Sequence, residues 1–300
     1  MQWDDFRRSA NIDDLRSSGP MVGGGGMGGS GLGIGGLIIV GLISWALGID
    51  PRILIGGLEA VQGQGSQQQQ GPTPPSKTGT PSDQQGQFVA AVLGDSEDRW
   101  TEIFREQFGR NYQPPRLVLF RGATRSGCGF AQAAMGPFYC PQDQRVYLDT
   151  SFFNDLENRF HGCSGKACQF SQAYVITHEV GHHVQNLLGI LPKVQQAQQS
   201  MGTSQRNAAQ VRVELQADCF AGVWANHSQQ KWNFLEQGDI QAALQTASAI
   251  GDDRLQKQTQ GYVVPDSFTH GSGAQRMQWF QTGFKSGKVN DCNTFGQGAS

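Results

Sequence analysis

The run His178-Glu179-Val180-Gly181-His182 has the residue types and the spacing to bind a metal ion and to use it in hydrolysis. Residues four apart on a helix lie on one face, separated by about 6 Å of rise, so both imidazoles can reach one cation. Glu179 lies between them, where it can contact a metal-bound water instead of the metal itself. The pattern predicts a site with His178 and His182 as zinc ligands and Glu179 as general base.

A catalytic zinc ion usually has three protein ligands and one position open to water. Glu214 is the best candidate for the third ligand, because a second helix-periodic stretch at 206–227 would carry it. Asp218 follows one helical turn later and suits a hydrogen bond to the second ring nitrogen of a ligand histidine. The alternative for both acids is a solvated helix face, against which the small and apolar neighbours Ala217 and Phe220 argue.

Two other histidines fit the same metal poorly. His183 points about 100° away from His182 around the helix axis, so we expect it to pack in the interior or lie at the surface. His161 precedes Cys163 and Cys168, and a second zinc cluster there is an alternative that lacks a second cysteine pair at the usual spacing.

The pair H-E-x-x-H and E-x-x-A-D resembles the gluzincin group of zinc peptidases, which implies His178, His182 and Glu214 as ligands of one zinc ion per chain. Nearly the whole chain is similar to the bacterial YpfJ-like family of neutral zinc metallopeptidases. This resemblance is carried by four segments, at 136–141, 177–185, 214–222 and 268–272.

The resemblance also suggests roles for two residues near the C-terminus. Membrane zinc peptidases of the gluzincin type carry a histidine after the acidic motif that donates to the developing oxyanion, which implies this role for His270. Arg276 would then orient the site or the substrate. Gly271 stands where those enzymes have proline, and a polar residue at a helix N-terminus is the alternative for His270.

The helices and strands predicted around these residues indicate an α+β fold with more helix than strand. Helices are predicted at 88–108, 240–250 and 275–284 besides the two metal-bearing ones, and strands at 116–120 and 145–149. A strand-like run is also present at 262–265. In zincin-like folds a strand edge beside the active helix pairs with substrate, and Val146, Tyr147 and Leu148 are the candidates; an ordinary interior strand is the alternative.

An uncharged, apolar and glycine-rich stretch runs from Gly31 to Ile49, about long enough to cross a bilayer. An interfacial or signal-like segment is the alternative. More arginines precede the stretch than follow it, which predicts a cytoplasmic N-terminus. The expected protein is therefore a single-pass protein of the bacterial inner membrane, with its catalytic domain on the periplasmic or extracellular side.

The six cysteines all follow that stretch, as expected in an oxidising compartment. Short spacing favours Cys128 with Cys140 and Cys163 with Cys168, which leaves Cys219 with Cys292. Buried free thiols are the alternative for some of them.

The domain organisation follows from composition. We expect a cytoplasmic segment at 1–30, the anchor at 31–49, a flexible linker rich in Gln, Gly and Pro at 50–87, and a zinc metallopeptidase domain at 88–300. A net charge of −2 and a pI near 6.3 argue against nucleic acid as a partner. The sequence leaves the oligomeric state open.

These features together predict a membrane-anchored zinc endopeptidase that acts on peptide or protein substrates. Two alternatives remain open at this point: a catalytically inactive, zinc-stabilised envelope scaffold or binding protein, and an amidase acting on cell-wall peptides. Both alternatives use the same metal site, so the sequence does not separate them.

Overall fold

The computed structural model describes residues 1–18, 77–132, 136–158, 163–165 and 168–296. In this part the chain is predominantly helical with a small sheet, which confirms the α+β class. The helices are α3 (Gln84–Ile103), α4 (Phe152–Asn158), α5 (Cys168–Leu187), α6 (Ile190–Gln198), α7 (Thr203–Trp232), α8 (Asp239–Ala249), α9 (Asp252–Gln260) and α10 (Gly273–Ser286). The strands are β1 (Ile12–Asp14), β2 (Lys77–Thr78), β3 (Arg116–Phe120), β4 (Ala123–Ser126), β5 (Gly129–Gln132), β6 (Phe138–Cys140) and β7 (Arg145–Asp149).

The main sheet has the strand order β2-β1-β3-β7-β6, and β4 with β5 forms a separate hairpin. The central pairs β1–β3 and β3–β7 are parallel, whereas β2 and β6 join antiparallel at the two edges. Parallel strands are usually buried on both faces, and β3 and β7 each have four buried residues of five.

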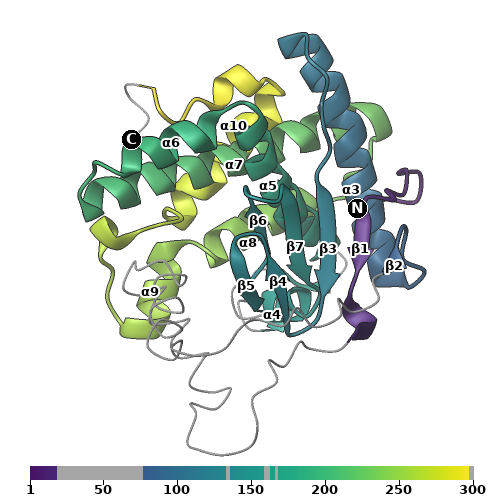
Figure 1. Cartoon of the computed structure of the whole chain (residues 1–300), viewed down its shortest axis with the longest axis horizontal. Helices are drawn as coiled ribbons and strands as arrows, with labels where there is room; N and C mark the ends of the chain where they lie inside the picture. Colours follow the sequence, from purple (N-terminus) through teal and green to yellow (C-terminus); the bar gives the residue numbers. More distant parts are fainter. Residues whose placement is uncertain (19–76, 133–135, 159–162, 166–167, 297–300) are drawn as a thin grey trace, which may run out of the picture.

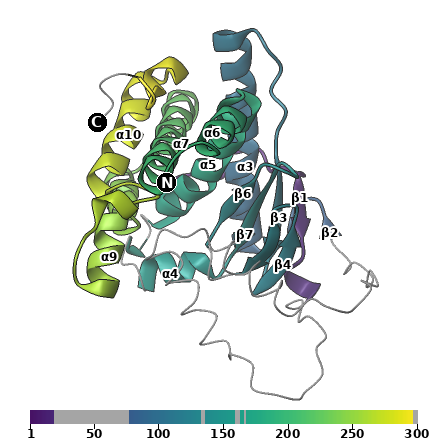
Figure 2. The same ribbon diagram turned by 60° about the vertical axis from the view of Figure 1, so that its left-hand side comes forward.

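The helices that carry the candidate ligands lie beside this sheet in successive layers (Figure 1). Figure 2 shows α5 nearest the strands, α7 next to it and α10 on the outside. Aromatic residues fill the space between the helices: Trp100 meets Phe220 edge-on at 5.7 Å between ring centroids, and Phe170 stacks on Trp224 at 6.3 Å. All four of these side chains are fully buried. The two helices that carry the candidate ligands are therefore held in the core of the protein.

Most elements predicted in the catalytic domain are present. Both predicted strands, at 116–120 and 145–149, have the expected bounds, and Gly189 follows α5 in the left-handed conformation with φ 74°, as a helix stop requires. The helix predicted at 88–108 begins earlier, at Gln84, where Asp83 accepts a hydrogen bond from the Gly86 N–H, and its last turn is a π-helix at Phe104–Phe108. The expected strand at 262–265 is absent: Tyr262, Val263 and Val264 form an exposed irregular segment.

The N-terminal residues belong to the same folded body as the catalytic domain. Ile12 is fully buried, β1 pairs with β3 from Ile12↔Leu117 to Asp14↔Leu119, and the Ser9 amide donates to Ala90 of α3. The prediction of a separate segment at 1–30 is therefore wrong for residues 1–18. The predicted linker and domain boundary are corrected in the same way, because β2 and the start of α3 lie before residue 88.

This pairing also bears on the predicted membrane topology. The apolar stretch 31–49 lies outside the described residues, and within them no helix is long and apolar enough to span a bilayer. The chain leaves the sheet after β1 and returns at β2 as its antiparallel neighbour, with Asp14 opposite Lys77. A single crossing between these two strands would put hydrogen-bonded partners on opposite sides of the membrane. The single-pass arrangement with the N-terminus and the domain on opposite sides is therefore incompatible with the sheet.

The candidate substrate strand is likewise corrected. Val146, Tyr147 and Leu148 lie in β7, which pairs with β3 on one side and with β6 on the other. The backbone of β7 is thus already used within the sheet, and the alternative of an interior strand is confirmed. Among the described strands, the sheet edge that packs against α5 is β6.

The predicted disulfide pairing is confirmed in full. Cys128 bonds Cys140, Cys163 bonds Cys168, and Cys219 bonds Cys292. The first joins the hairpin to β6, the second lies at the start of α5, and the third ties the C-terminal segment to α7. The third closes the longest loop, with a sequence separation of 73, and so constrains the unfolded chain most.

Candidate metal centre

A glycine allows the two metal-bearing helices to approach closely. A Cβ atom placed on Gly181 would lie 2.9 Å from the carbonyl oxygen of Ala217, which is closer than side-chain carbons come to such atoms. Gly181 lies between Glu179 and His182 on α5, and Ala217 lies between Glu214 and Asp218 on α7. The close approach therefore occurs at the level of the candidate ligands and brings the two halves of the site together.

Gly181→Ala is expected to lower the free energy of unfolding by about 1–3 kcal/mol, because the new methyl group forces α5 away from α7. The same shift separates the histidines from Glu214, so zinc affinity should fall as well. Gly202→Ala is the matched control, since a Cβ there meets no atom within 4 Å and φ is −68°. Equal stability and zinc affinity of the two variants, measured by urea unfolding and by chelator competition, would contradict the role given to Gly181.

The three candidate ligands converge. Ligand atoms of His178, His182 and Glu214 all lie within 4.8 Å of one another. The Glu214 Oε2 atom is 3.2 Å from His178 Nε2 and 3.4 Å from His182 Nε2. Two imidazole nitrogens and one carboxylate oxygen form a donor set typical of catalytic zinc, which takes three protein ligands and a water molecule. The residues present therefore fit a zinc ion.

The second ring nitrogen of each histidine also has a partner. His178 Nδ1 lies 2.8 Å from Asp218 Oδ1, as the sequence predicts for Asp218. His182 Nδ1 lies 2.9 Å from Gln185 Oε1, a contact that the sequence interpretation missed. Each partner orients its ring so that Nε2 faces Glu214.

Arg276 of α10 holds Asp218 in place. Its Nε and Nη2 atoms donate to the two carboxylate oxygens of Asp218, each at 2.9 Å, and the Tyr174 hydroxyl donates to the same carboxylate. Asp218 is fully buried and Arg276 is 3% exposed, so this ion pair is shielded from solvent. Arg276 was predicted to orient the site or the substrate, and the structure places it on Asp218, with its Nη2 also 3.5 Å from His178 Nδ1.

In this site, neighbouring charges shift the pKa values of the histidines and of Glu214 more than burial does. Burial alone would lower the pKa of His178, but the Asp218 and Glu214 carboxylates raise it to about 10 in the metal-free protein. Burial would raise the pKa of Glu214, yet His182 and His178 hold it well below its usual value. Because the pKa of His178 is raised, zinc binding must displace a proton from this imidazole.

Glu179 lies on α5 between the two histidines and is 7% exposed. Its carboxylate is near enough to the His182 ring to help raise the pKa of that imidazole, against the lowering effect of burial. An acid in this position can exchange a proton with a water molecule at the ligand cluster, as the sequence motif predicts.

His270 lies on the loop before α10. Its charge and that of Glu214 shift each other's pKa, which places the two groups close together. Asp252 fixes this loop: its Oδ2 accepts the backbone N–H groups of Thr269, His270 and Gly271 at 2.7, 2.6 and 3.0 Å, and its Oδ1 lies 3.3 Å from His270 Nδ1. His270 Nδ1 also lies 3.0 Å from the Thr269 hydroxyl oxygen, so this ring nitrogen is engaged within the loop and by Asp252.

The backbone at Gly271 explains why proline is absent there. Gly271 has φ 86°, in the left-handed region, whereas the proline ring restricts φ to about −65°. The loop that presents His270 therefore differs in backbone geometry from a loop with proline at this position.

His183 takes the structural role expected for it. The ring is 1% exposed, with Nε2 2.7 Å from the Gln113 carbonyl oxygen and Nδ1 3.0 Å from the Tyr139 hydroxyl. These contacts hold α5 against β6 and against the segment that precedes β3. The remaining candidate, His161, lies outside the described residues.

In the metal-free protein, His183 should contribute a loss of about 2 kcal/mol of stability between pH 7 and pH 5, seen as the difference from His183→Gln. Burial lowers the pKa of His183 to about 4, so the unfolded chain, with a value near 6.5, binds the proton first. The stabilising contribution of neutral His183 is therefore complete above pH 6.5 and is lost as the pH falls towards 4. His178, His182 and His270 have raised pKa values and change the stability in the opposite direction in this window, but they do so equally in both proteins. Urea unfolding of the chelator-treated protein and of His183→Gln tests this, and equal pH slopes in both proteins would refute it.

Two residues of the site were missed in the sequence. Gln185 is three positions after His182, and helical spacing alone could have identified it as a neighbour. Asp252 precedes His270 by 18 positions, on a different helix, and no local pattern relates the two. Only the folded chain brings them together.

A helix with two histidines four residues apart, a glutamate between them and a second glutamate on the neighbouring helix form the arrangement typical of zinc metallopeptidases. The comparison with known families agrees. Residues 1–295 match the family described as "Putative neutral zinc metallopeptidase", and the chain belongs to that family, whose cofactor is zinc.

Relatives in two groups of bacteria are similar over long stretches. The chain is 49% identical to "Uncharacterized protein YpfJ" of Escherichia coli strain K12 over 300 residues, covering 99% of both chains. It is 42% identical to "Uncharacterized protein Rv2575" of Mycobacterium tuberculosis strain H37Rv over 229 residues, covering 73% of this chain and 74% of the relative. No solved structure matches.

Proposed function

We propose that the protein is an endopeptidase that hydrolyses peptide bonds with zinc held by His178, His182 and Glu214. The observation that carries this proposal is the convergence of the three ligand atoms within 4.8 Å, on helices that also hold Glu179. When bound, zinc lowers the pKa of a water molecule and polarises the substrate carbonyl.

The chain's own residues would handle the protons. Glu179 takes a proton from the attacking water and later delivers it to the nitrogen of the leaving amine. His270, whose Nδ1 is engaged by Asp252, donates from Nε2 to the oxyanion that develops on the carbonyl. Arg276 acts as a positioning residue through Asp218 and His178. A substrate strand bound by backbone pairing would add to β6, the sheet edge beside α5.

The test uses the purified full-length chain, loaded with zinc, on denatured protein and on cell-wall fragments. Cleavage of denatured protein that stops with chelator and returns with zinc supports the endopeptidase. Cleavage of cell-wall fragments alone would favour the amidase, and cleavage of neither would favour the scaffold.

We also propose that the folded part of the chain works in an oxidising compartment outside the cytoplasm. Three disulfides support this, and no cysteine of the chain is left free. Attachment to the inner membrane through residues 31–49 is part of the same proposal, with residues 1–18 on the same side as the catalytic domain.

Labelling of intact cells tests this arrangement. Single added cysteines at Gln2 and at the exposed Tyr262 should both react with a membrane-impermeant maleimide. Labelling of Tyr262→Cys without Gln2→Cys would contradict a shared side, and labelling of neither would contradict an external location.

A further inference from the structure

The two ligand histidines are oriented by different kinds of partner. Asp218, which is charged and held by Arg276, accepts from His178. The partner of His182 is a neutral amide, Gln185, which accepts or donates depending on which way its end group is turned. What fixes the orientation of this amide therefore decides which nitrogen of His182 carries a proton.

The hydrogen bonds beyond Gln185 settle that orientation. Its Nε2 donates to the Val213 carbonyl oxygen at 2.7 Å and to Gln216 Oε1 at 3.1 Å. Gln216 in turn donates from Nε2 to the Cys292 carbonyl oxygen at 2.9 Å. A backbone carbonyl can only accept, so both amides must turn their NH₂ groups towards these carbonyls.

The fixed orientation of Gln185 determines which ring nitrogen of His182 carries a hydrogen. With both hydrogens of Gln185 directed at Val213 and Gln216, its Oε1 is left to face His182 Nδ1 and can only accept there. Nδ1 must keep its hydrogen, and the nitrogen that can release a proton and bind a cation is Nε2, which faces Glu214. Gln185 is fully buried and Gln216 is 5% exposed, so water competes little for these bonds.

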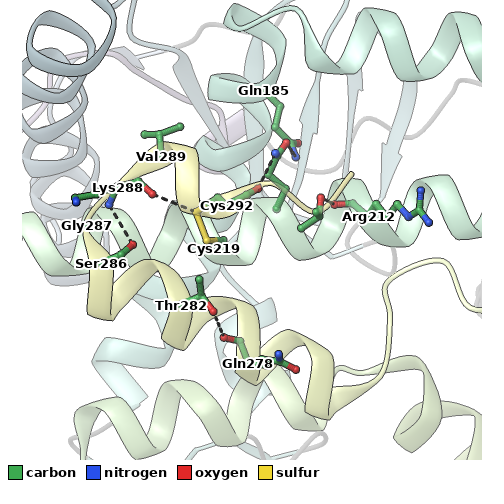
Figure 3. Close-up of a disulfide and its surroundings, with 12 residues drawn as sticks. Gln185, Arg212, Cys219, Gln278, Thr282, Ser286, Gly287, Lys288, Val289 and Cys292 are labelled. Atoms are coloured by element: carbon green, nitrogen blue, oxygen red, sulfur yellow. Dashed lines mark hydrogen bonds between the residues drawn. A yellow bond between two sulfur atoms is a disulfide. The ribbon is translucent and has the colours of Figure 1, made fainter. Parts of the chain in front are cut away.

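The far end of this chain of hydrogen bonds is held by a disulfide. Cys292 closes the short 3₁₀ helix η6 (Val289–Cys292), and its sulfur bonds Cys219 of α7. Figure 3 shows this bond joining α7 to the C-terminal segment, with Gln185 beside it. Cys219 directly follows Asp218 and lies three residues after Gln216. One stretch of α7 therefore carries a cysteine of the disulfide, the partner of His178, and the residue that hydrogen-bonds Gln185.

We propose that Gln185 and Gln216 form an amide relay that sets the tautomer of His182, and that the Cys219–Cys292 disulfide positions the Cys292 carbonyl on which this relay depends. Breaking the disulfide or either amide then weakens zinc binding, although none of these residues contacts the metal. The inference rests on the proposed zinc site.

Zinc affinity of the full-length chain is the first measurement, by competition with a chromophoric chelator. Gln185→Met, Gln216→Met and the double variant Cys219→Ala/Cys292→Ala should each bind zinc about 10–100-fold more weakly than the unmodified protein. Two controls are matched. Gln107→Met removes an amide that also hydrogen-bonds the C-terminal segment, at Gly287 and Val289, and Cys128→Ala/Cys140→Ala removes a different disulfide. Both controls should bind zinc like the unmodified protein.

A second measurement separates orientation of the ring from general loss of structure. In the zinc-bound protein, the Nδ1 proton of His182 should give a slowly exchanging ¹H–¹⁵N signal, and this signal should be lost in Gln216→Met while the Nδ1 signal of His178 persists. Gln216→Met keeps side-chain volume and the disulfide, so it tests the relay even if the cysteine variant does not fold.

The outcomes are distinguishable. Zinc binding by the unmodified protein together with unchanged affinity and an unchanged His182 signal in Gln216→Met overturns the relay. An equal loss of zinc affinity in Gln107→Met would show that the effect comes from anchoring of the C-terminal segment, and this result would also overturn the relay. Failure of the unmodified protein to bind zinc removes the proposed function itself.

Discussion

Glu179→Gln is expected to bind one zinc ion per chain as the unmodified protein does and to lose kcat/KM by about 10²–10⁴-fold. The amide has nearly the same shape as the carboxylate, but it cannot take a proton from the attacking water. Metal binding should be preserved because Glu179 is not among the three proposed ligands, His178, His182 and Glu214. The measurements are zinc content after dialysis and the rate of cleavage of a denatured protein substrate.

Glu106→Gln is the matched control for this experiment, since it makes the same chemical change on a carboxylate whose side chain is 59% exposed. It should cleave at the unmodified rate. Turnover close to normal in Glu179→Gln would refute the assignment of the base, whereas loss of zinc in that variant would show that Glu179 supports the metal directly.

Arg276→Met should have the largest effect on stability, with a loss of about 3–5 kcal/mol in the free energy of unfolding. The substitution leaves the Asp218 carboxylate buried with only Tyr174 and His178 as partners. At present Asp218 has its pKa lowered to about 2, because Arg276 and His178 outweigh the opposing effect of burial. Without the guanidinium, a charged Asp218 becomes costly, and the orientation of His178 weakens with it.

The double variant Asp218→Asn/Arg276→Met provides the test of this explanation. Removing both charges should cost less than the sum of the two single substitutions, because no uncompensated charge stays buried. Unfolding in urea and zinc competition measure the two effects. Additive losses would mean that the ion pair is not the source of the instability, and Arg276→Met with normal stability would exclude the role of Arg276 altogether.

The metal site was predictable because helical periodicity converts sequence spacing into direction. His178 and His182 share one face of α5, and Glu214 and Asp218 share one face of α7, so two periodic stretches were enough to suggest the ligand set and its carboxylate partner. The disulfides were predictable for a similar reason, since two short spacings left one pair over.

The errors concern contacts that depend on which strands become neighbours. β1 has three residues and β2 has two, too few for a period-2 pattern to stand out from the surrounding polar sequence. Whether β7 lies at an edge or in the interior depends on β6 and β3, which are separate segments of the chain. The relation between Asp252 and His270 likewise forms only when α9 and the loop before α10 meet.

The neighbouring positions of Asp14 and Lys77 have a practical meaning for protein production. Trimming the chain at residue 88 to remove the apolar stretch would strip two strands, including the buried Ile12, and should yield aggregates. Excising the intervening residues and joining β1 to β2 through a short Asn-Gly reverse turn would instead keep every strand, since adjacent antiparallel strands are the geometry that such turns connect. An internally shortened chain, not an N-terminally truncated one, is the form to crystallise.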